Sequence, residues 1–184
     1  MPQLSLDDIQ AGAERARTGA RLPPVESWNP RLSGDIDIRI ARDGTWYHEG
    51  GAINRLELVR LFSSLLKREG DEYFLVTPVE KWRIQVEDAP FVIVALAREV
   101  DAAGTQQLVF ATNVGDQVIA GPDHPLRIEP DTAGRGLAPY LRVRRNLEAL
   151  LSRPVYYQLA EIAEPAPDGD GHGVASGGMF HRLA

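Results

Sequence analysis

The sequence predicts an α+β protein made of two similar small halves, each a strand hairpin followed by a helix and a strand. Apolar and polar residues alternate strictly over residues 35–40, which is the period of a half-buried strand. Over residues 54–70 the apolar residues recur instead at helical spacing. A helix-then-strand pattern recurs at 146–162, so a weak internal duplication accounts for both halves.

The N-terminal segment is predicted to hold one short helix and an extended lead-in. Ser5 is placed to cap a helix that runs to about Arg17, with acidic residues in its first turn. Prolines in residues 22–30 fix an extended path there and exclude both helix and central strand. We expect Val25 and Trp28 of this path to pack against the core.

A hairpin and a helix form the first half. Asp43-Gly44 is the strongest short turn signal in the chain, and it joins the strand at 35–40 to a return strand at 45–48. Asn54 and Glu57 then form the pattern of a capping box. We expect the helix to end at Gly70. Its apolar face comprises Leu58, Val59, Phe62, Leu65 and Leu66, and its polar face comprises Glu57, Arg60, Ser64, Lys67 and Arg68.

The centre of the chain joins the two halves through an alternating strand. A β-prone run at 73–77 ends at Pro78, and polar and apolar residues then alternate over 81–87. Lys81 and Arg83 therefore share one face of this strand. The run that begins at Phe91 is apolar enough for burial on both faces.

The second half is predicted to contain several short strands and one short helix. The strands lie at 91–100, 106–113, 117–120, 126–129 and 140–144, with a helix at 146–152 and a last strand at 155–162. The rest of the chain is rich in Pro, Asp, Gly and Ser, which is typical of a flexible tail. The predicted parts are a lead-in at 1–21, a first half at 22–82, a second half at 83–163 and a tail at 164–184.

Composition narrows the classes of function. The 184 residues carry a net charge of −6, which argues against broad nucleic-acid binding. The chain has no cysteine, so thiolate metal sites and disulfides are excluded. The longest apolar run is far shorter than a membrane span, and the N-terminus lacks the layout of a signal peptide. We expect a cytoplasmic protein that does not insert into a membrane.

The familiar catalytic and phosphate-binding motifs are absent from the sequence. There is no Gly-x-Ser-x-Gly elbow, no Walker loop and no Gly-x-Gly-x-x-Gly before a helix. The histidines and carboxylates match no metal-ligand spacing. We therefore assign no catalytic residue and no metal ligand, and the sequence specifies no cofactor.

Several motifs, in order over residues 22–162, resemble a bacterial family catalogued as domain of unknown function 1285. The resemblance implies a core built by duplication, with a second half superficially like a pleckstrin-homology domain. It also implies a small-ligand site where the halves meet, with a nucleotide-like molecule as one candidate, and a role in signalling. The tail lies outside the resemblance. The matching stretches are 23–30, 34–40, 43–48, 60–63, 76–81, 86–91, 113–116 and 155–157.

The candidate ligand-binding residues are polar and aromatic side chains on strands near the join, with two from the motif at 113–116. Arginine and lysine beside aromatic rings suit an anionic, planar ligand. Lys81 stands out because it is one of only two lysines in an arginine-rich chain, and Lys67 is expected on the exposed face of a helix. The candidates are Trp46, His48, Lys81, Arg83, Glu87, Asn113, Asp116, Tyr140, Arg142 and Arg144.

Three classes of function stay open. The first is a non-enzymatic module that binds a small ligand between its halves. The second is a hydrolase or transferase that uses His48 as a base, beside a carboxylate such as Glu80 or Glu87. The third is an adaptor that takes a peptide strand on an exposed sheet edge.

Overall fold

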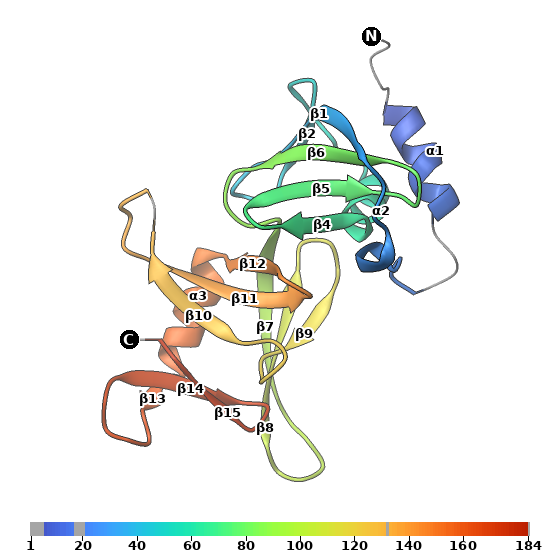
Figure 1. Ribbon diagram of the computed structural model, residues 1–184. Coiled ribbons are helices and arrows are strands. Elements are labelled where there is room, and N and C mark those ends of the chain that lie inside the picture. Colours follow the sequence, from blue (N-terminus) through green and yellow to red (C-terminus); the bar gives the residue numbers. More distant parts are fainter. Residues whose placement is uncertain (1–5, 17–20, 132, 184) are drawn as a thin grey trace. The chain divides into compact units, whose positions relative to one another are not determined.

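The computed structural model describes residues 6–16, 21–131 and 133–183, and it divides into two compact units between Asp88 and Ala89 (Figure 1). We describe each unit by itself. The sequence placed the boundary between residues 82 and 83. The strand at Lys81–Val86 belongs wholly to the first unit because it pairs in parallel with the strand at Leu32–Ile40.

The first unit is built on a mixed six-stranded sheet in the order β3-β2-β1-β6-β5-β4. The β1·β6 pair is parallel, and the other four neighbouring pairs are antiparallel. The first three strands run from the centre of the sheet to one edge, and the next three return from the opposite edge to the centre. The strands are β1 (Leu32–Ile40), β2 (Trp46–His48), β3 (Gly51–Ala52), β4 (Leu66–Glu69), β5 (Glu72–Val76) and β6 (Lys81–Val86).

The predicted hairpin at Asp43-Gly44 is confirmed. Gly44 has φ +87°, and the Asp43 carboxylate accepts a hydrogen bond of 2.9 Å from the backbone N–H of Thr45. The side chain therefore closes the turn that brings β2 back antiparallel to β1.

Helix α2 (Leu56–Ser64) is shorter than predicted. Its N-cap residue is Arg55, with no side-chain capping hydrogen bond, so the capping box at Asn54 and Glu57 is wrong. The chain leaves the helix at Leu65 and forms β4, whose Leu66 pairs with Leu75 of β5. Pairing with β5 thus outweighs the helical propensity of residues 66–69. Gly70, with φ +61°, turns the β4–β5 hairpin instead of ending a helix.

The N-terminal segment contains α1 (Leu6–Ala16) and a short 3₁₀ helix, η1 (Val25–Ser27). The 3₁₀ turn departs from the extended path predicted for residues 22–30. Val25 is fully buried, as predicted, and Trp28 is half-buried. The expected cap at Ser5 and the expected helix end near Thr18 lie outside the described residues.

The second unit repeats the same strand path in the order β10-β11-β12-β7-β8-β9. The β12·β7 pair at its centre is parallel, and the other neighbours are antiparallel. The first three strands again run outward and the next three return. They are β7 (Phe91–Val100), β8 (Gln106–Thr112), β9 (Gln117–Ile119), β10 (Leu126–Pro130), β11 (Leu137–Arg144) and β12 (Leu147–Leu151).

Strand β7 is buried only at its start, so the prediction of burial on both faces is wrong for most of it. Residues 91–93 are buried, where β12 pairs with β7. Beyond them, Val94 is 53% exposed and Val100 is 68% exposed. This part of β7 continues as a hairpin with β8 (Figure 1).

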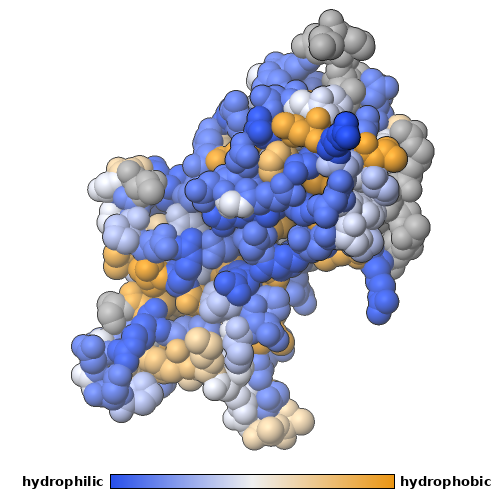
Figure 2. Space-filling view, in the orientation of Figure 1, coloured by the Kyte–Doolittle hydropathy of each residue, from blue (hydrophilic) through white to orange (hydrophobic). Residues whose placement is uncertain are grey.

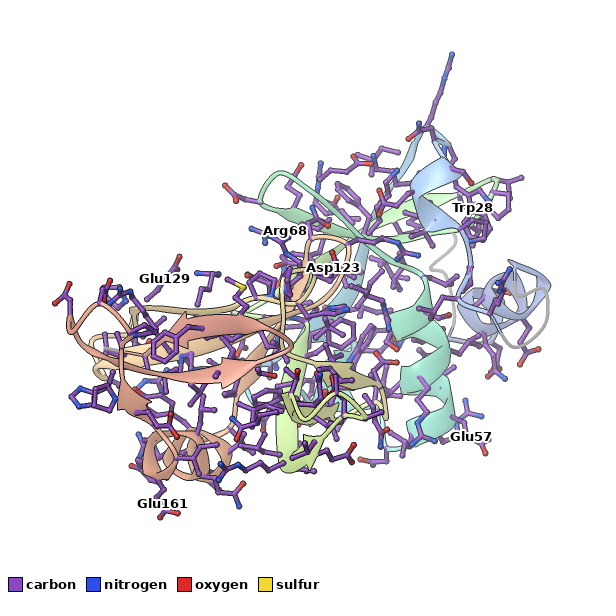
Figure 3. All side chains as sticks on the ribbon, turned by 90° about the horizontal axis from the view of Figure 1, so that it is seen from below. Trp28, Glu57, Arg68, Asp123, Glu129 and Glu161 are labelled. Carbon is purple, nitrogen blue, oxygen red and sulfur yellow. The ribbon has the colours of Figure 1, made fainter. Side chains whose placement is uncertain are left out.

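The last helix and strand of the second unit are exchanged relative to the prediction. Residues 147–151 form β12 rather than a helix, because they pair with β11 on one side and β7 on the other. Residues 153–161 form α3 (Arg153–Glu161) rather than a strand, with a proline in its first turn. Val155 and Leu159 are four residues apart and form its buried face. Glu57 of α2 and Glu161 of α3 both point away from the ribbon (Figure 3).

The repeated helix-then-strand pattern is therefore not what makes the two units alike. Each unit is instead a mixed six-stranded sheet with a helix, and the strands follow the same path in both. This suggests two similar halves. The helix lies between the third and fourth strands in the first unit and after the sixth strand in the second.

The predicted flexible tail forms a third, three-stranded sheet of β13 (Glu164–Pro165), β14 (His172–Ser176) and β15 (Met179–Arg182). The hydroxyl of Ser176 donates to the carbonyl of Ala120 (2.7 Å) and accepts from the N–H of Leu108 (2.9 Å). Gly173 allows the two strands to approach, because a Cβ there would lie 2.1 Å from the His181 carbonyl oxygen. The tail prediction is wrong because its glycines serve close packing and turns rather than flexibility.

Candidate functional site

The first sheet has one apolar face and one charged face. The ring of Trp46 lies 6.3 Å from the ring of Phe62 in α2, so α2 covers the face that carries Trp46. The pairing register places Lys67, Phe74 and Arg83 on the opposite face. Figure 2 shows mostly hydrophilic residues over β4, β5 and β6. We call this second face the charged face; it comprises Asp35, Lys67, Glu69, Glu72, Phe74, Lys81 and Arg83.

Lys81 and Arg83 of β6 both lie close to the ring of Phe74 on the charged face. Phe74 is only 3% exposed. The ammonium nitrogen of Lys81 lies 4.4 Å from its ring centre, and the guanidinium carbon of Arg83 lies 5.8 Å from it. Both distances allow a cation–π contact. The prediction that Lys81 and Arg83 share a face is confirmed.

Glu69 binds both lysines of the chain. Its two carboxylate oxygens lie 2.5 Å from the Lys81 ammonium and 3.4 Å from the Lys67 ammonium. The hydrogen bond from Lys81 is the main cause of a lowered pKa for the Glu69 carboxyl. Glu69 is thus held in its charged form between two positive groups.

Lys67 is buried, so its predicted place on an exposed helix face is wrong. Its ammonium donates to the carbonyl of Trp28 (3.1 Å) and to the side-chain oxygen of Asn29 (3.2 Å). Both acceptors belong to the segment that follows η1, and Figure 3 labels Trp28. These contacts, together with Glu69, compensate the burial of a charged amine.

Arg83 has carboxylate partners that are open to solvent. Its guanidinium lies 2.9 Å from an oxygen of Asp35 and 2.8 Å from an oxygen of Glu72. The side chain of Arg83 is 37% exposed, and those of Asp35 and Glu72 are 72% and 55% exposed. Exposed pairs of this kind are weak, so other anions can replace the two carboxylates.

Trp46 and His48 lie on the face that α2 covers, whereas Glu87 lies on the side of the charged face but contacts different residues. Trp46 is buried against α2, and His48 follows on the same side of β2. Glu87 binds the Arg39 side chain and accepts a hydrogen bond of 3.0 Å from the backbone N–H of Arg42. Arg39 pairs with Tyr47, so Glu87 belongs to the face opposite His48.

The geometry also separates His48 from Glu80. Lys81, which follows Glu80, pairs with Leu32, whereas His48 pairs with Ile38. Gln85 pairs with Arg39, the neighbour of Ile38, so about four residues of β6, or about 13 Å along a strand, separate these positions. In the described part of the chain, the His48 side chain forms no hydrogen bond or ion pair. The structure therefore does not bring together the base and carboxylate of the enzyme hypothesis.

Asp116 and Arg144 form an ion pair in the second unit, in which the Asp116 side chain is 32% exposed. Their side chains lie 2.6 Å apart, and the guanidinium of Arg144 is 4.8 Å from the ring centre of Phe91. The Arg144 side chain is only 11% exposed, and burial lowers its pKa. This pair resembles Lys81, Glu69 and Phe74 in composition, but its cation is more deeply buried.

Tyr140 belongs to a buried apolar cluster with Ala89, Ala138 and Leu150. The guanidinium carbon of Arg127 lies 4.5 Å from the Tyr140 ring centre. The hydroxyl-bearing ring is 8% exposed, which gives it a packing role.

The last two candidates of the second unit, Asn113 and Arg142, take part in hydrogen-bond contacts of the backbone. The side-chain oxygen of Asn113 accepts a hydrogen bond of 3.0 Å from the N–H of Val92, so Asn113 fixes the start of β7. Arg142 is exposed, and its carbonyl lies 3.0 Å from the Nδ1 atom of His124.

Sequence reasoning missed Asp35, Lys67, Glu69, Glu72 and Phe74 as members of the charged face. The signal that could have found them is the register of the β4–β5 hairpin. It was hidden because residues 66–69 were assigned to the preceding helix.

Two kinds of feature are absent from the described residues. The described residues contain no group of three or more His, Cys, Asp or Glu side chains that could hold a metal ion. Within the same residues, no helix combines the length and apolar character that crossing a membrane requires.

These features define a two-domain α+β protein with one charged sheet face. Residues 23–89 match the N-terminal domain of the family described as "Domain of unknown function (DUF1285)", and residues 90–183 match the C-terminal domain of that family. The chain therefore belongs to the DUF1285 family, as its motifs indicated. The match extends through β15, so the segment after residue 163 is part of the family domain rather than a tail beyond it.

Two solved structures of the family are similar to this chain. A DUF1285 protein from Silicibacter pomeroyi DSS-3 is 48% identical, with a TM-score of 0.85, and the alignment covers 95% of this chain and 93% of the relative. A DUF1285 protein from Shewanella baltica OS155 is 31% identical, with a TM-score of 0.54, and the alignment covers 68% and 91%. No curated protein matches the chain.

Proposed function

We propose that this protein is a non-enzymatic module that binds a small anionic ligand, and that the charged face of the first unit holds the ligand. One observation carries the proposal. Lys81 and Arg83 of one strand lie within 6 Å of a single buried ring, and the carboxylates that pair with Arg83 are more than half exposed.

Binding on this face is an exchange of anions. Asp35 and Glu72 are held by solvent-exposed pairs, each of which contributes about 0–1 kcal/mol. A phosphate or carboxylate that forms a bidentate contact with Arg83 replaces two weak contacts by one of better geometry. The ligand thus binds without any rearrangement of the buried core.

In this proposal the ligand contacts the charged face through its own negatively charged groups. Phe74 is almost wholly covered, so it supports the cations rather than stacking on a ligand ring. A nucleotide-like ligand would therefore bind through its phosphates. A signalling role, and a likeness of the second unit to pleckstrin-homology domains, belong to the same proposal and rest on the family resemblance alone.

The adaptor hypothesis stays a separate prediction. Strands β3 and β4 are the edges of the first sheet, and β9 and β10 are the edges of the second. A peptide strand could pair with such an edge. No observation favours one edge over another.

A titration with matched variants tests the proposed function. Pyrophosphate, AMP and citrate are each added at constant ionic strength, and the change in Tm and the Kd are measured. Arg68 supplies the control, because it lies in the same hairpin, contacts Tyr73 and Asp71, and pairs on the opposite face (Figure 3).

We expect at least one probe to raise the Tm of the wild-type protein. Arg83→Ala should weaken its binding at least tenfold, and Arg68→Ala should leave it unchanged. The proposal is wrong if no probe binds, or if the two arginine variants bind equally well.

A further inference from the structure

We infer that Lys67 and Lys81 form a binding site for a doubly charged oxyanion of the phosphate type, and that the chain's own Glu69 carboxylate fills this site as a competitor. The inference deepens the proposed function and rests on it. It names the chemical class of the ligand and a residue that regulates access to it.

The contacts of Glu69 are those that an oxyanion would make. Each of its two oxygens faces a different ammonium group, at 2.5 Å for Lys81 and 3.4 Å for Lys67. A phosphoryl group presents two oxygens in the same manner. Glu69 therefore shows the position and the spacing of the anion that the lysines accept.

The lysines are fixed, whereas Glu69 is placed to move. The side chain of Lys67 is 7% exposed and is held by Trp28 and Asn29, and that of Lys81 is 17% exposed. Glu69 is 38% exposed and is the last residue of edge strand β4, directly before the turn at Gly70. Its side chain can leave the site while both cations stay in place.

The charge balance selects a dianion. With Glu69 in place, the two lysines are left with one net positive charge. When Glu69 leaves, they offer two positive charges, which a phosphate dianion neutralises and a monocarboxylate does not. Because Glu69 must leave first, the apparent Kd equals the intrinsic Kd divided by the fraction of molecules in which the site is open.

Asp71 provides the matched control for Glu69. It lies two residues further along the same hairpin, is fully exposed and contacts Arg68 rather than the lysines or Arg83. Removing either residue changes the net charge equally, but only the loss of Glu69 opens the site between the lysines.

The experiment titrates inorganic phosphate into protein labelled with ¹³C at lysine, at pH 8 and constant ionic strength. The chain has only two lysines, so the spectrum contains one set of signals for each. We expect both sets to shift in Glu69→Ala, with a Kd at least tenfold lower than in the wild type. Asp71→Ala should bind phosphate no more than threefold more tightly than the wild type, and acetate should shift neither lysine.

The inference is overturned if Glu69→Ala binds phosphate no more tightly than Asp71→Ala. If Glu69→Ala does not fold, Glu69→Gln is judged by the same criterion. The wild type gives an independent test, because its affinity for phosphate should fall when the pH drops below the second pKa of phosphate and the monoanion replaces the dianion. Equal affinity at pH 8 and pH 6 contradicts the inference. If these tests fail while Arg83-dependent binding persists, the proposed function stands without this site.

Discussion

The two units follow the same strand path but use their charged groups differently. Both contain a cation over a buried aromatic ring beside a carboxylate: Lys81 with Phe74 and Glu69 in the first, and Arg144 with Phe91 and Asp116 in the second. The helix position also differs, since α2 precedes the returning strands and α3 follows them.

Burial decides what each charged group can do. The neighbouring cation of the first unit, Arg83, is 37% exposed and has exposed partners, whereas Arg144 is 11% exposed. An exposed pair can exchange its carboxylate for a ligand at little cost. Removing the carboxylate from Arg144 costs more, because a buried charge without its partner is strongly unfavourable. Under the proposed function, the exposed pairs of Arg83 give way to a ligand, whereas the pair of Arg144 stabilises the fold.

The largest predicted effect comes from removing Asp116. Asp116→Ala takes away the carboxylate that pairs with the largely buried Arg144, so we expect the free energy of unfolding of the second unit to fall by about 2 kcal/mol. Asp35→Ala, which removes an exposed partner of Arg83, should cost less than about 1 kcal/mol. Urea unfolding measures both. Equal losses for the two variants would contradict the contrast between the units.

Acid should destabilise the second unit before the first. Burial lowers the pKa of His181, whose Nδ1 atom accepts a hydrogen bond of 3.3 Å from the N–H of Leu126. Its neutral form is therefore favoured on folding. The stability that neutral His181 contributes is fully present above pH 6.5 and is lost as the pH falls through the lowered pKa of the folded state.

The first unit should keep its stability to lower pH. The pKa of Glu69 is lowered from 4.5, so its contribution to stability is present above pH 4.5 and lost as the pH falls through the folded pKa.

Trp28, Trp46 and Trp82 are the chain's tryptophans, and all lie in the first unit, so their fluorescence follows that unit alone. Amide signals of β14 and β15 follow the second. His181→Gln should remove the loss of stability that the second unit shows as the pH falls below 6.5. A pH profile of stability equal to that of the wild type would contradict this prediction.

The smallest predicted effect on stability is that of Lys81→Arg. The side chain is partly exposed, so we expect the free energy of unfolding to change by less than about 1 kcal/mol. Binding of pyrophosphate should weaken severalfold, because a longer, planar guanidinium does not place its charge where the compact ammonium lies over the Phe74 ring. Urea unfolding and titration measure the two parts. Binding equal to the wild type would show that Lys81 has no special role.

The sequence predicted the elements whose signals are local. The alternation of β1, the turn at Asp43-Gly44 and the shared face of Lys81 and Arg83 each follow from a few neighbouring residues, and the structure confirms them. The predictions failed where distant pairing overrides local propensity. Leucines at 66 and at 147–151 have the spacing of helices, yet they lie in strands because β5, β7 and β11 pair with them.

The candidate site was predictable only in part for the same reason. Lys81 and Arg83 lie on one strand, so their shared face could be read from alternation. Glu69 and Lys67 join them through the register of the hairpin β4–β5, which no local pattern specifies. Asp116 and Arg144 were chosen as ligand-binding residues because the sequence does not show that Arg144 is buried.

The most direct test of the central claim is a titration of ¹⁵N-labelled protein with pyrophosphate at constant ionic strength, followed through the backbone amide signals. The account predicts saturable shifts in β4, β5 and β6 around Glu69, Phe74 and Arg83, no comparable shifts in β11 and β12, and loss of the shifts in Arg83→Ala. Shifts centred on Arg144, or shifts that persist in Arg83→Ala, would contradict it.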